Sequence, residues 1–303
     1  MVSDLVMLVV MGTLVLFLLI MLANLILLWI RWKDREENAL KMITMLIAVP
    51  QDNEVKVESM EQIINSLTNM YKSAKFKFLQ RLIVQPNLSL EIVGTNDDVR
   101  FYVSCPKKFA DLIEKQIYSI YPGADVREID EPNFYPENGK VEYAWLGIKK
   151  SPYLPLKTYK ELATDSMSSF ATAMSKLEKG QALAIQLVLS PTDGKWAKSG
   201  KAFVSSTKKS ESNPEKASYK VDARQLEAID NKCSKPGFET AIRVISIAEN
   251  SELAKTNMSN IKAAFGQFES QWNKLSGRKI RFKGLFVEDF IYKYPTKIGR
   301  AHV

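Results

Sequence analysis

Histidine and cysteine are nearly absent from this sequence of 303 residues. It has one histidine, His302, and two cysteines, Cys105 and Cys233. Zinc and similar sites need several Cys or His ligands, and two isolated thiols outside any C-x-x-C pattern give no disulfide framework. The sequence therefore predicts no metal site and no cofactor. We interpret each cysteine as a small buried hydrophobic residue in a reducing compartment.

Motifs that bind phosphate or position a nucleophile are also missing. Glycine–lysine pairs end at Lys140, Lys195 and Lys201, but none completes the G-x-x-x-x-G-K-[ST] loop whose amides cradle phosphate. No G-x-G-x-x-G or G-x-S-x-G occurs. The adjacent carboxylates at 97–98 and 288–289 are typical of solvated surface pairs. We predict that this chain is not an enzyme and has no catalytic residue.

Charge is absent from one long run near the N-terminus, residues 5–30. Of its 26 positions, 18 are Leu, Val, Ile or Phe. A helix of that length reaches about 39 Å, and the hydrocarbon core of a bilayer is about 30 Å thick. The run predicts a transmembrane helix. A cleaved signal peptide fits poorly because there is no basic segment before the run and no small-x-small site after it, and an interfacial helix would need a polar face.

The charges that flank this run are unequal. Only Asp4 precedes it, whereas residues 31–42 form a basic juxtamembrane segment. Because basic residues stay on the cytoplasmic side, we expect the N-terminus outside and the soluble part in the cytoplasm, at the inner (plasma) membrane. Indole rings favour the headgroup layer. The predicted membrane-flanking residues are Trp29, Arg31, Trp32, Lys33 and Arg35.

The pattern after the anchor predicts an α+β protein with two tandem ferredoxin-like (split βαβ) domains. For the first, at 43–130, the predicted order is strand, helix, strand, strand, helix, strand. Its first helix begins with a capping-box pattern at Ser59 and Gln62. A proline-rich linker follows at 131–140.

The second domain, at 141–296, repeats the same order with an insertion at 192–235. We expect its final strand at 285–292. The duplication is inferred from the order of elements, because no sequence motif is repeated.

A lysine-rich stretch lies inside this insertion. Its lysines outnumber its acidic residues and contribute to the net charge of +8. The simplest interpretation is a solvated, flexible loop. The alternative is a contact with lipid headgroups or nucleic acid. Five lysines are the candidates for that contact: Lys195, Lys198, Lys201, Lys208 and Lys209.

The last six residues, 298–303, are interpreted as a tail translated from adapter DNA. Six codons of a common sequencing adapter would encode them. We therefore expect that the natural chain continues beyond Thr296, and we give His302 no functional weight. Different codons in the encoding DNA would remove this hypothesis.

A series of short segments, spread over residues 43–295, resembles an uncharacterised N-terminal domain family of bacterial type IV secretion-like and conjugation-type ATPases. The order of the segments carries the resemblance, and none of them is catalytic. They include Arg100–Val103 before a proline-initiated helix, Gln116–Tyr118, Lys157–Tyr159, Lys235–Phe238 and Ala263–Phe265.

This resemblance implies a membrane anchor, then this region, then a P-loop motor, although the chain ends before any motor. It implies a non-catalytic scaffold that positions the motor at the membrane, with secretion-channel proteins or further copies of the chain as partners. The alternative is a complete single-pass protein whose cytosolic domains bind a protein partner or nucleic acid.

Overall fold

The computed structural model describes residues 2–50, 55–71, 73, 85–132, 139–211 and 221–295. Contacts divide the chain into two units, which are described separately: helix α1 belongs to the first, and the chain from Met42 to Tyr71 and from Gln85 onward forms the second. The predicted adapter tail at 298–303 and most of the predicted linker at 131–140 lie outside the described residues.

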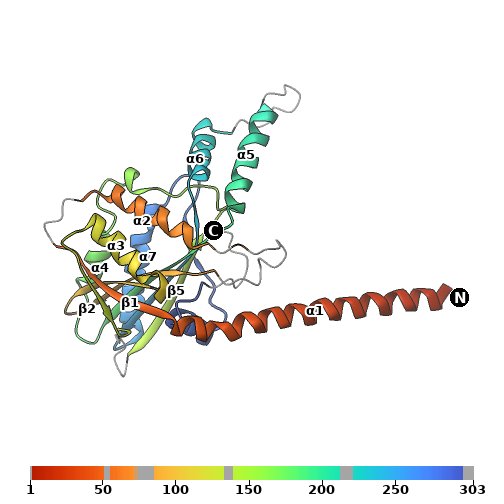
Figure 1. Ribbon diagram of the computed structural model, residues 1–303, viewed down its shortest axis with the longest axis horizontal. Helices are drawn as coiled ribbons and strands as arrows, with labels where there is room; N and C mark the ends of the chain where they lie inside the picture. Colours follow the sequence, from red (N-terminus) through yellow and green to blue (C-terminus); the bar gives the residue numbers. More distant parts are fainter. Residues whose placement is uncertain are drawn as a thin grey trace. The chain divides into compact units, whose positions relative to one another are not determined.

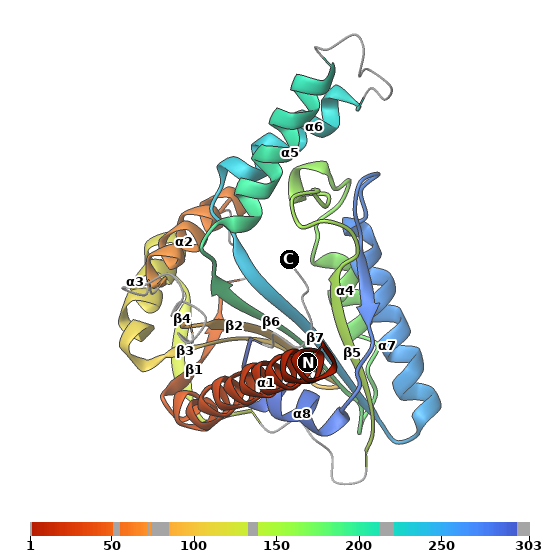
Figure 2. The ribbon, with the colours of Figure 1, turned by 90° about the vertical axis from the view of Figure 1, so that its right-hand side faces the viewer.

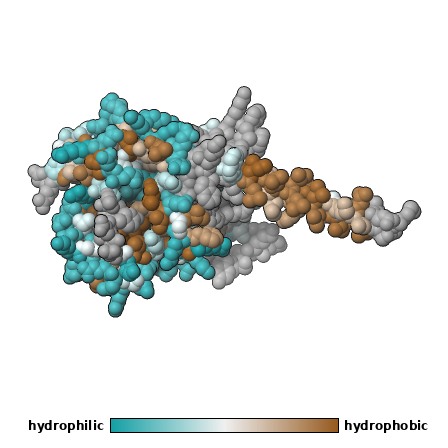
Figure 3. Space-filling view, turned by 90° about the horizontal axis from the view of Figure 1, so that it is seen from below, coloured by the Kyte–Doolittle hydropathy of each residue, from teal (hydrophilic) through white to brown (hydrophobic). Residues whose placement is uncertain are grey.

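Helix α1 (Val2–Leu40) is a single helix of 39 residues. Within it, Val6–Ile26 is long and apolar enough, by length and composition, to cross a membrane, and none of it is buried. The apolar surface of α1 is continuous along this segment (Figure 3). The prediction of a helix over 5–30 is confirmed, and the helix continues through most of the basic stretch to Leu40.

The second unit contains one sheet of eight strands, in the order β4-β1-β3-β2-β6-β7-β5-β8. Each pair of neighbouring strands is antiparallel. Apolar side chains of these strands point to both faces of the sheet, because each face is covered over part of its area. The strands are Met42–Ala48 (β1), Leu88–Thr95 (β2), Val99–Pro106 (β3), Asp125–Ile129 (β4), Lys140–Ile148 (β5), Ala182–Pro191 (β6), Phe238–Ala248 (β7) and Leu275–Arg278 (β8).

Seven α-helices are described in this unit, with short 3₁₀ segments at several of their ends. The α-helices are Met60–Leu67 (α2), Ala110–Ile120 (α3), Ser168–Met174 (α4), Lys195–Glu211 (α5), Ala223–Ser234 (α6), Ser251–Phe265 (α7) and Lys283–Ile291 (α8). The 3₁₀ segments are Val57–Ser59 (η1), Thr68–Met70 (η2), Lys107–Phe109 (η4), Tyr159–Glu161 (η5) and Gly266–Phe268 (η6).

Helices α2, α3, α4 and α7 cover one face of the sheet (Figures 1 and 2). Two apolar clusters fill this layer, one under α2 and α3 and one under α4 and α7. In the second cluster, the rings of Phe170 and Phe265 meet edge to face with centroids 4.8 Å apart. Cys105 lies in the first cluster, where burial raises the pKa of its thiol to about 12. The interpretation of both cysteines as buried residues is confirmed.

Helix α8 covers the middle of the opposite face through Phe286 and Phe290. This face also contains a buried polar row in which Glu91 of β2 lies opposite Gln186 of β6, and Gln186 opposite Arg243 of β7. The Gln186 amide donates to Glu91 Oε1 at 3.1 Å and accepts from Arg243 Nη1 at 2.8 Å. Burial raises the pKa of Glu91, although Lys293 opposes the shift.

The same row holds the C-terminal end of α8. Arg243 Nη1 donates to the carbonyl of Asp289 at 3.1 Å, and Nη2 donates to that of Tyr294. Gln186 donates to the carbonyl of Phe290 at 2.9 Å. The last carbonyls of a helix have no partner within it. Here the carbonyls of Asp289 and Phe290 accept from the backbone amides of Tyr294 and Lys293, and side chains from two strands donate to them as well.

The structure corrects one prediction about exposure and three about secondary structure. In the pair at 288–289, which was predicted to be solvated, Asp289 is buried. The strand predicted at 285–292 is wrong, because this segment is helix α8 and the final strand is β8, at Leu275–Arg278. The apolar run at 285–292 is too short for its pattern to distinguish a strand from a helix. Phe286 and Phe290 are nevertheless four residues apart, so they share one helix face. The capping box at Ser59 is also absent, since this residue continues a 3₁₀ turn and its side chain makes no cap hydrogen bond.

The third correction to secondary structure concerns the lysine-rich stretch that was predicted to be a flexible loop. Its described part is helix α5, of 17 residues. The sequence also gave no indication that the two halves share a sheet, with β2 paired along its length to β6, from Leu88 opposite Leu189 to Thr95 opposite Ala182.

Candidate functional site

Helices α5 and α6, with the strand ends from which they emerge, are the candidate site. The two helices lie side by side and project from the sheet (Figures 1 and 2). We call this pair the α5–α6 arm. It has a small core of its own, in which Val204 packs against Leu226, Ile229 and Cys233. Trp196 and Phe203 lie at the border of this core, so one face of α5 is committed to packing.

Gly200 sets how closely the two helices approach. A Cβ atom at this position would lie 2.4 Å from Cys233 Sγ and 2.7 Å from Tyr153 Cβ. Neither neighbour can move far, because Cys233 is buried in the arm core and the ring of Tyr153 stacks on Phe203 with centroids 5.3 Å apart. The absence of a side chain at Gly200 is therefore a packing requirement of the arm.

We expect Gly200→Ala to destabilise the protein by about 1–3 kcal/mol, because the added methyl group overpacks the arm core. Gly266→Ala is the matched control, since a Cβ there meets nothing within 4 Å. The control should be neutral or slightly stabilising. Urea unfolding followed by tryptophan fluorescence measures both variants. Equal stability of the two variants would contradict the close approach at Gly200.

All five candidate lysines of the sequence prediction lie on α5, and all are exposed. At 3.6 residues per turn, four of them fall within an arc of about 100° that does not overlap the side packed on α6. Those four are Lys198, Lys201, Lys208 and Lys209. Lys195 lies at the start of the helix, where its ammonium group pairs with Asp193 at 2.6 Å. The helix therefore gathers the predicted residues into one cationic face.

Lys232 has a different role, which the sequence did not indicate. It lies on the packed side of α6, and its ammonium group donates to the carbonyls of Pro152 at 2.6 Å and Leu154 at 3.3 Å. It also lies 5.7 Å from the ring centre of Trp196. Burial lowers the pKa of Lys232 to about 8. This lysine joins the arm to the segment that follows β5.

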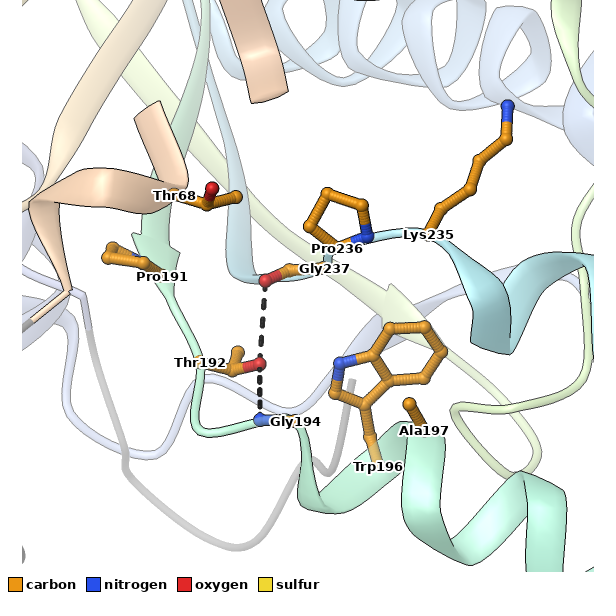
Figure 4. A pocket seen from close by; sticks show the side chains of 9 residues that line it. All are labelled: Thr68, Pro191, Thr192, Gly194, Trp196, Ala197, Lys235, Pro236 and Gly237. Carbon is orange, nitrogen blue, oxygen red and sulfur yellow. Dashed lines mark hydrogen bonds between the residues drawn. The ribbon is translucent and has the colours of Figure 1, made fainter. Parts of the chain in front are cut away.

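A pocket of about 110 Å³ opens at the base of the arm. It lies between the turn after β6, the first turn of α5, the connection from α6 to β7, and η2. In Figure 4, Thr192 bridges two backbone segments: its hydroxyl donates to the carbonyl of Gly237 at 3.4 Å and accepts from the amide of Gly194 at 3.3 Å. The residues that line the pocket are Thr68, Pro191, Thr192, Gly194, Trp196, Ala197, Lys235, Pro236 and Gly237.

One titratable side chain, Lys235, lines this pocket. Its ammonium group lies 3.4 Å from Glu61 Oε2, and Glu61 Oε1 accepts from the hydroxyl of Tyr159 at 3.2 Å. The hydrogen bond from Tyr159 and the charge of Lys235 hold the pKa of Glu61 below its usual value. The cluster links the arm to α2. Among the described residues, no group of Cys, His, Asp and Glu could hold a metal ion.

The predicted membrane-flanking residues all lie within α1. Trp29 is exposed. The side chains of the other four, Arg31, Trp32, Lys33 and Arg35, are outside the described part of the structure. Because α1 continues to Leu40, the apolar segment and the basic segment form one unbroken helix.

One family model, described as a domain of unknown function (DUF8128), matches residues 35–274. The chain belongs to this family. The match begins inside the basic end of α1 and ends just before β8, so it includes the whole arm.

No curated protein matches the sequence. The crystal structure of aclacinomycin oxidoreductase is similar with a TM-score of 0.33 and 9% identity, over 75% of this chain and 41% of that chain. The chain therefore spans less than half of that protein, and a similarity this low carries no argument about fold or function.

Proposed function

We propose that this chain is a membrane-anchored binding module whose folded unit is displayed at the cytoplasmic face. The observation that carries the proposal is the segment Val6–Ile26 of α1, a span of 21 residues with no buried part. A helix that is apolar on all sides is stable in lipid and costly to expose to water. The excess of basic residues after the segment favours a cytoplasmic position for the folded unit.

A binding role, rather than catalysis, is supported by the pocket at the arm base. Its lining has a single titratable residue, Lys235. General acid–base and nucleophilic mechanisms need at least a pair of suitably placed groups. The lysine face of α5, on the same arm, suits electrostatic contact with a partner.

We also propose that each half of the sheet is a ferredoxin-like domain. The order β4-β1-β3-β2 in the first half and β8-β5-β7-β6 in the second support this, because both follow the split βαβ arrangement. The α5–α6 arm is then an insertion between the second and third strands of the second domain.

The more specific proposal is that the chain is the N-terminal region of a type IV secretion or conjugation-type ATPase, which anchors and positions the motor. The ordered resemblance of short segments over residues 43–295 supports it. Sequencing the gene downstream of Tyr294 tests it: a Walker A motif would favour this proposal. A native stop codon there would favour a complete single-pass protein that binds a protein partner or nucleic acid.

The anchor and its orientation are tested in cells that express the full chain. We expect the chain to stay in the membrane pellet after an alkaline carbonate wash. We also expect the folded unit to resist protease added to intact cells and to be digested once the inner membrane is opened. A chain recovered in the supernatant, or shortened at its N-terminus by cleavage, would contradict the anchor. Digestion from outside intact cells would contradict the orientation alone.

A further inference from the structure

The exposed face of α5 has charge of one sign. Lys198, Lys201 and Lys208 form no ion pair with any described residue. On α5 and at its ends, Asp193 pairs with Lys195 and Glu211 accepts from the amide of Val221. The other acidic side chains of the arm belong to α6: Asp222 caps this helix, and Glu227 and Asp230 are exposed on it. Like charges spaced along one helix face repel one another, so this face gains free energy when an anionic surface approaches it.

The side chains between these lysines narrow the choice of anion. The exposed positions among them are small: Ser199, Ala202, Ser205, Ser206 and Ser210. Trp196 and Phe203 are turned into the arm core. The face therefore has no aromatic ring on which the bases of a single strand could stack. It also has no large apolar residue to insert between acyl chains, so contact with a bilayer would be limited to headgroups.

The cations are also all of one type. The sequence of α5 contains lysine and no arginine. Arginine suits bidentate recognition of individual phosphates, including those of nucleic acids, whereas lysine acts as a compact point charge with no fixed geometry. A row of lysines on one helix face matches a broad, planar field of negative charge better than a set of defined phosphate positions.

We infer that the lysine face of α5 binds the headgroups of an anionic lipid bilayer, through electrostatic attraction and without insertion. This inference rests on the proposed membrane anchor, which keeps the folded unit close to headgroups. A second, weak contact with the same membrane then becomes intramolecular and is favoured by a high effective concentration. The α5–α6 arm would orient the folded unit on the membrane according to the anionic lipid content.

The test uses the full chain inserted into nanodiscs of phosphatidylcholine, mixed with vesicles rich in phosphatidylglycerol. Each lysine near an anionic surface contributes a factor of about five to binding. The triple variant Lys198→Gln, Lys201→Gln and Lys208→Gln should therefore lower the vesicle partition coefficient about a hundredfold. Binding of the unaltered chain should weaken as salt is added and should be absent with phosphatidylcholine vesicles.

A matched control removes the same charge elsewhere in the folded unit. Lys179, Lys255 and Lys262 are exposed and lie outside the arm. Their replacement by glutamine should leave most of the vesicle binding intact. An equal loss in the control and in the α5 variant would overturn the inference, because net charge and not the α5 face would then determine binding.

Two further outcomes would also overturn it. One is the absence of binding to anionic vesicles. The other is tighter binding of a short DNA duplex to the same lysines, which would assign the face to nucleic acid. A failure of the anchor is seen at an earlier stage, because a chain without a membrane-spanning α1 would not enter the nanodisc. That result would count against the proposed function before any vesicle is added.

Discussion

Two arginines placed in the middle of the apolar span, Leu16→Arg and Ile20→Arg, are expected to release the chain from the membrane. On an insertion scale, leucine and isoleucine contribute about −0.5 kcal/mol each near the centre of a spanning helix, and arginine about +3 kcal/mol. The pair therefore makes insertion less favourable by about 7 kcal/mol. The two positions are one helical turn apart near the middle of the span, so both charges would have to enter the hydrocarbon core.

Carbonate extraction followed by immunoblotting measures this effect. The control is Leu40→Arg, which adds a positive charge at an exposed position of the same helix but outside Val6–Ile26. It should leave the chain in the membrane pellet and, by the positive-inside rule, keep its orientation. If the double variant also stays in the pellet, α1 is not the element that holds the chain there.

Arg243→Leu is expected to destabilise the folded unit by about 3–5 kcal/mol, the range found when one partner is removed from a buried charged pair or network. The side chain of Arg243 is almost fully buried, with 1% of its surface exposed. Its loss would leave the carbonyls of Asp289 and Tyr294, and the amide oxygen of Gln186, without this donor. Since the free energy of unfolding of a domain is about 5–15 kcal/mol, this single change would remove a large fraction of it.

Urea unfolding of the full chain compares Arg243→Leu with the conservative variant Arg243→Lys. Lysine keeps the charge but cannot reach several acceptors at once from a fixed fork, so its loss of stability should be intermediate. Hydrogen exchange adds a second measurement: amides at the end of α8 should lose protection before those of the central strands. Uniform loss of protection, or unchanged stability of Arg243→Leu, would contradict the role of this arginine in holding α8.

The regular part of the fold could be predicted because local periodicity determines it. Short apolar segments are typical of strands. The two at 43–49 and 238–248 were predicted to be strands, and the structure places β1 at Met42–Ala48 and β7 at Phe238–Ala248. Helix α5 was missed because its many lysines resemble a solvated segment. The helical signal was nevertheless present, since Trp196, Phe203 and Val204 recur at spacings close to whole turns.

The features that depend on long-range contacts were not predictable from one sequence. The acceptors of Arg243 include backbone carbonyls that are positioned only after α8 has docked. Lys232 is similar, because it donates to the carbonyls of Pro152 and Leu154, about 80 residues earlier in the chain. Every residue has a backbone carbonyl, so the sequence does not show which carbonyl will accept a hydrogen bond. The five α5 lysines were predicted together as candidates for one contact, but only the helix shows that four of them share a face.

The pairing of β2 with β6 has a consequence for how copies of this protein can meet. Two separate four-stranded sheets would present four edges with unused amide and carbonyl groups, and such edges invite polymerisation by strand addition. Among the described strands, joining the sheets leaves the outer sides of β4 and β8 as edges. The first is short and has alternating charges at Asp125, Arg127 and Glu128, and the second has four residues. With two edges in place of four, the described unit has less backbone available for strand addition, so aggregation of copies through their sheets is less favoured.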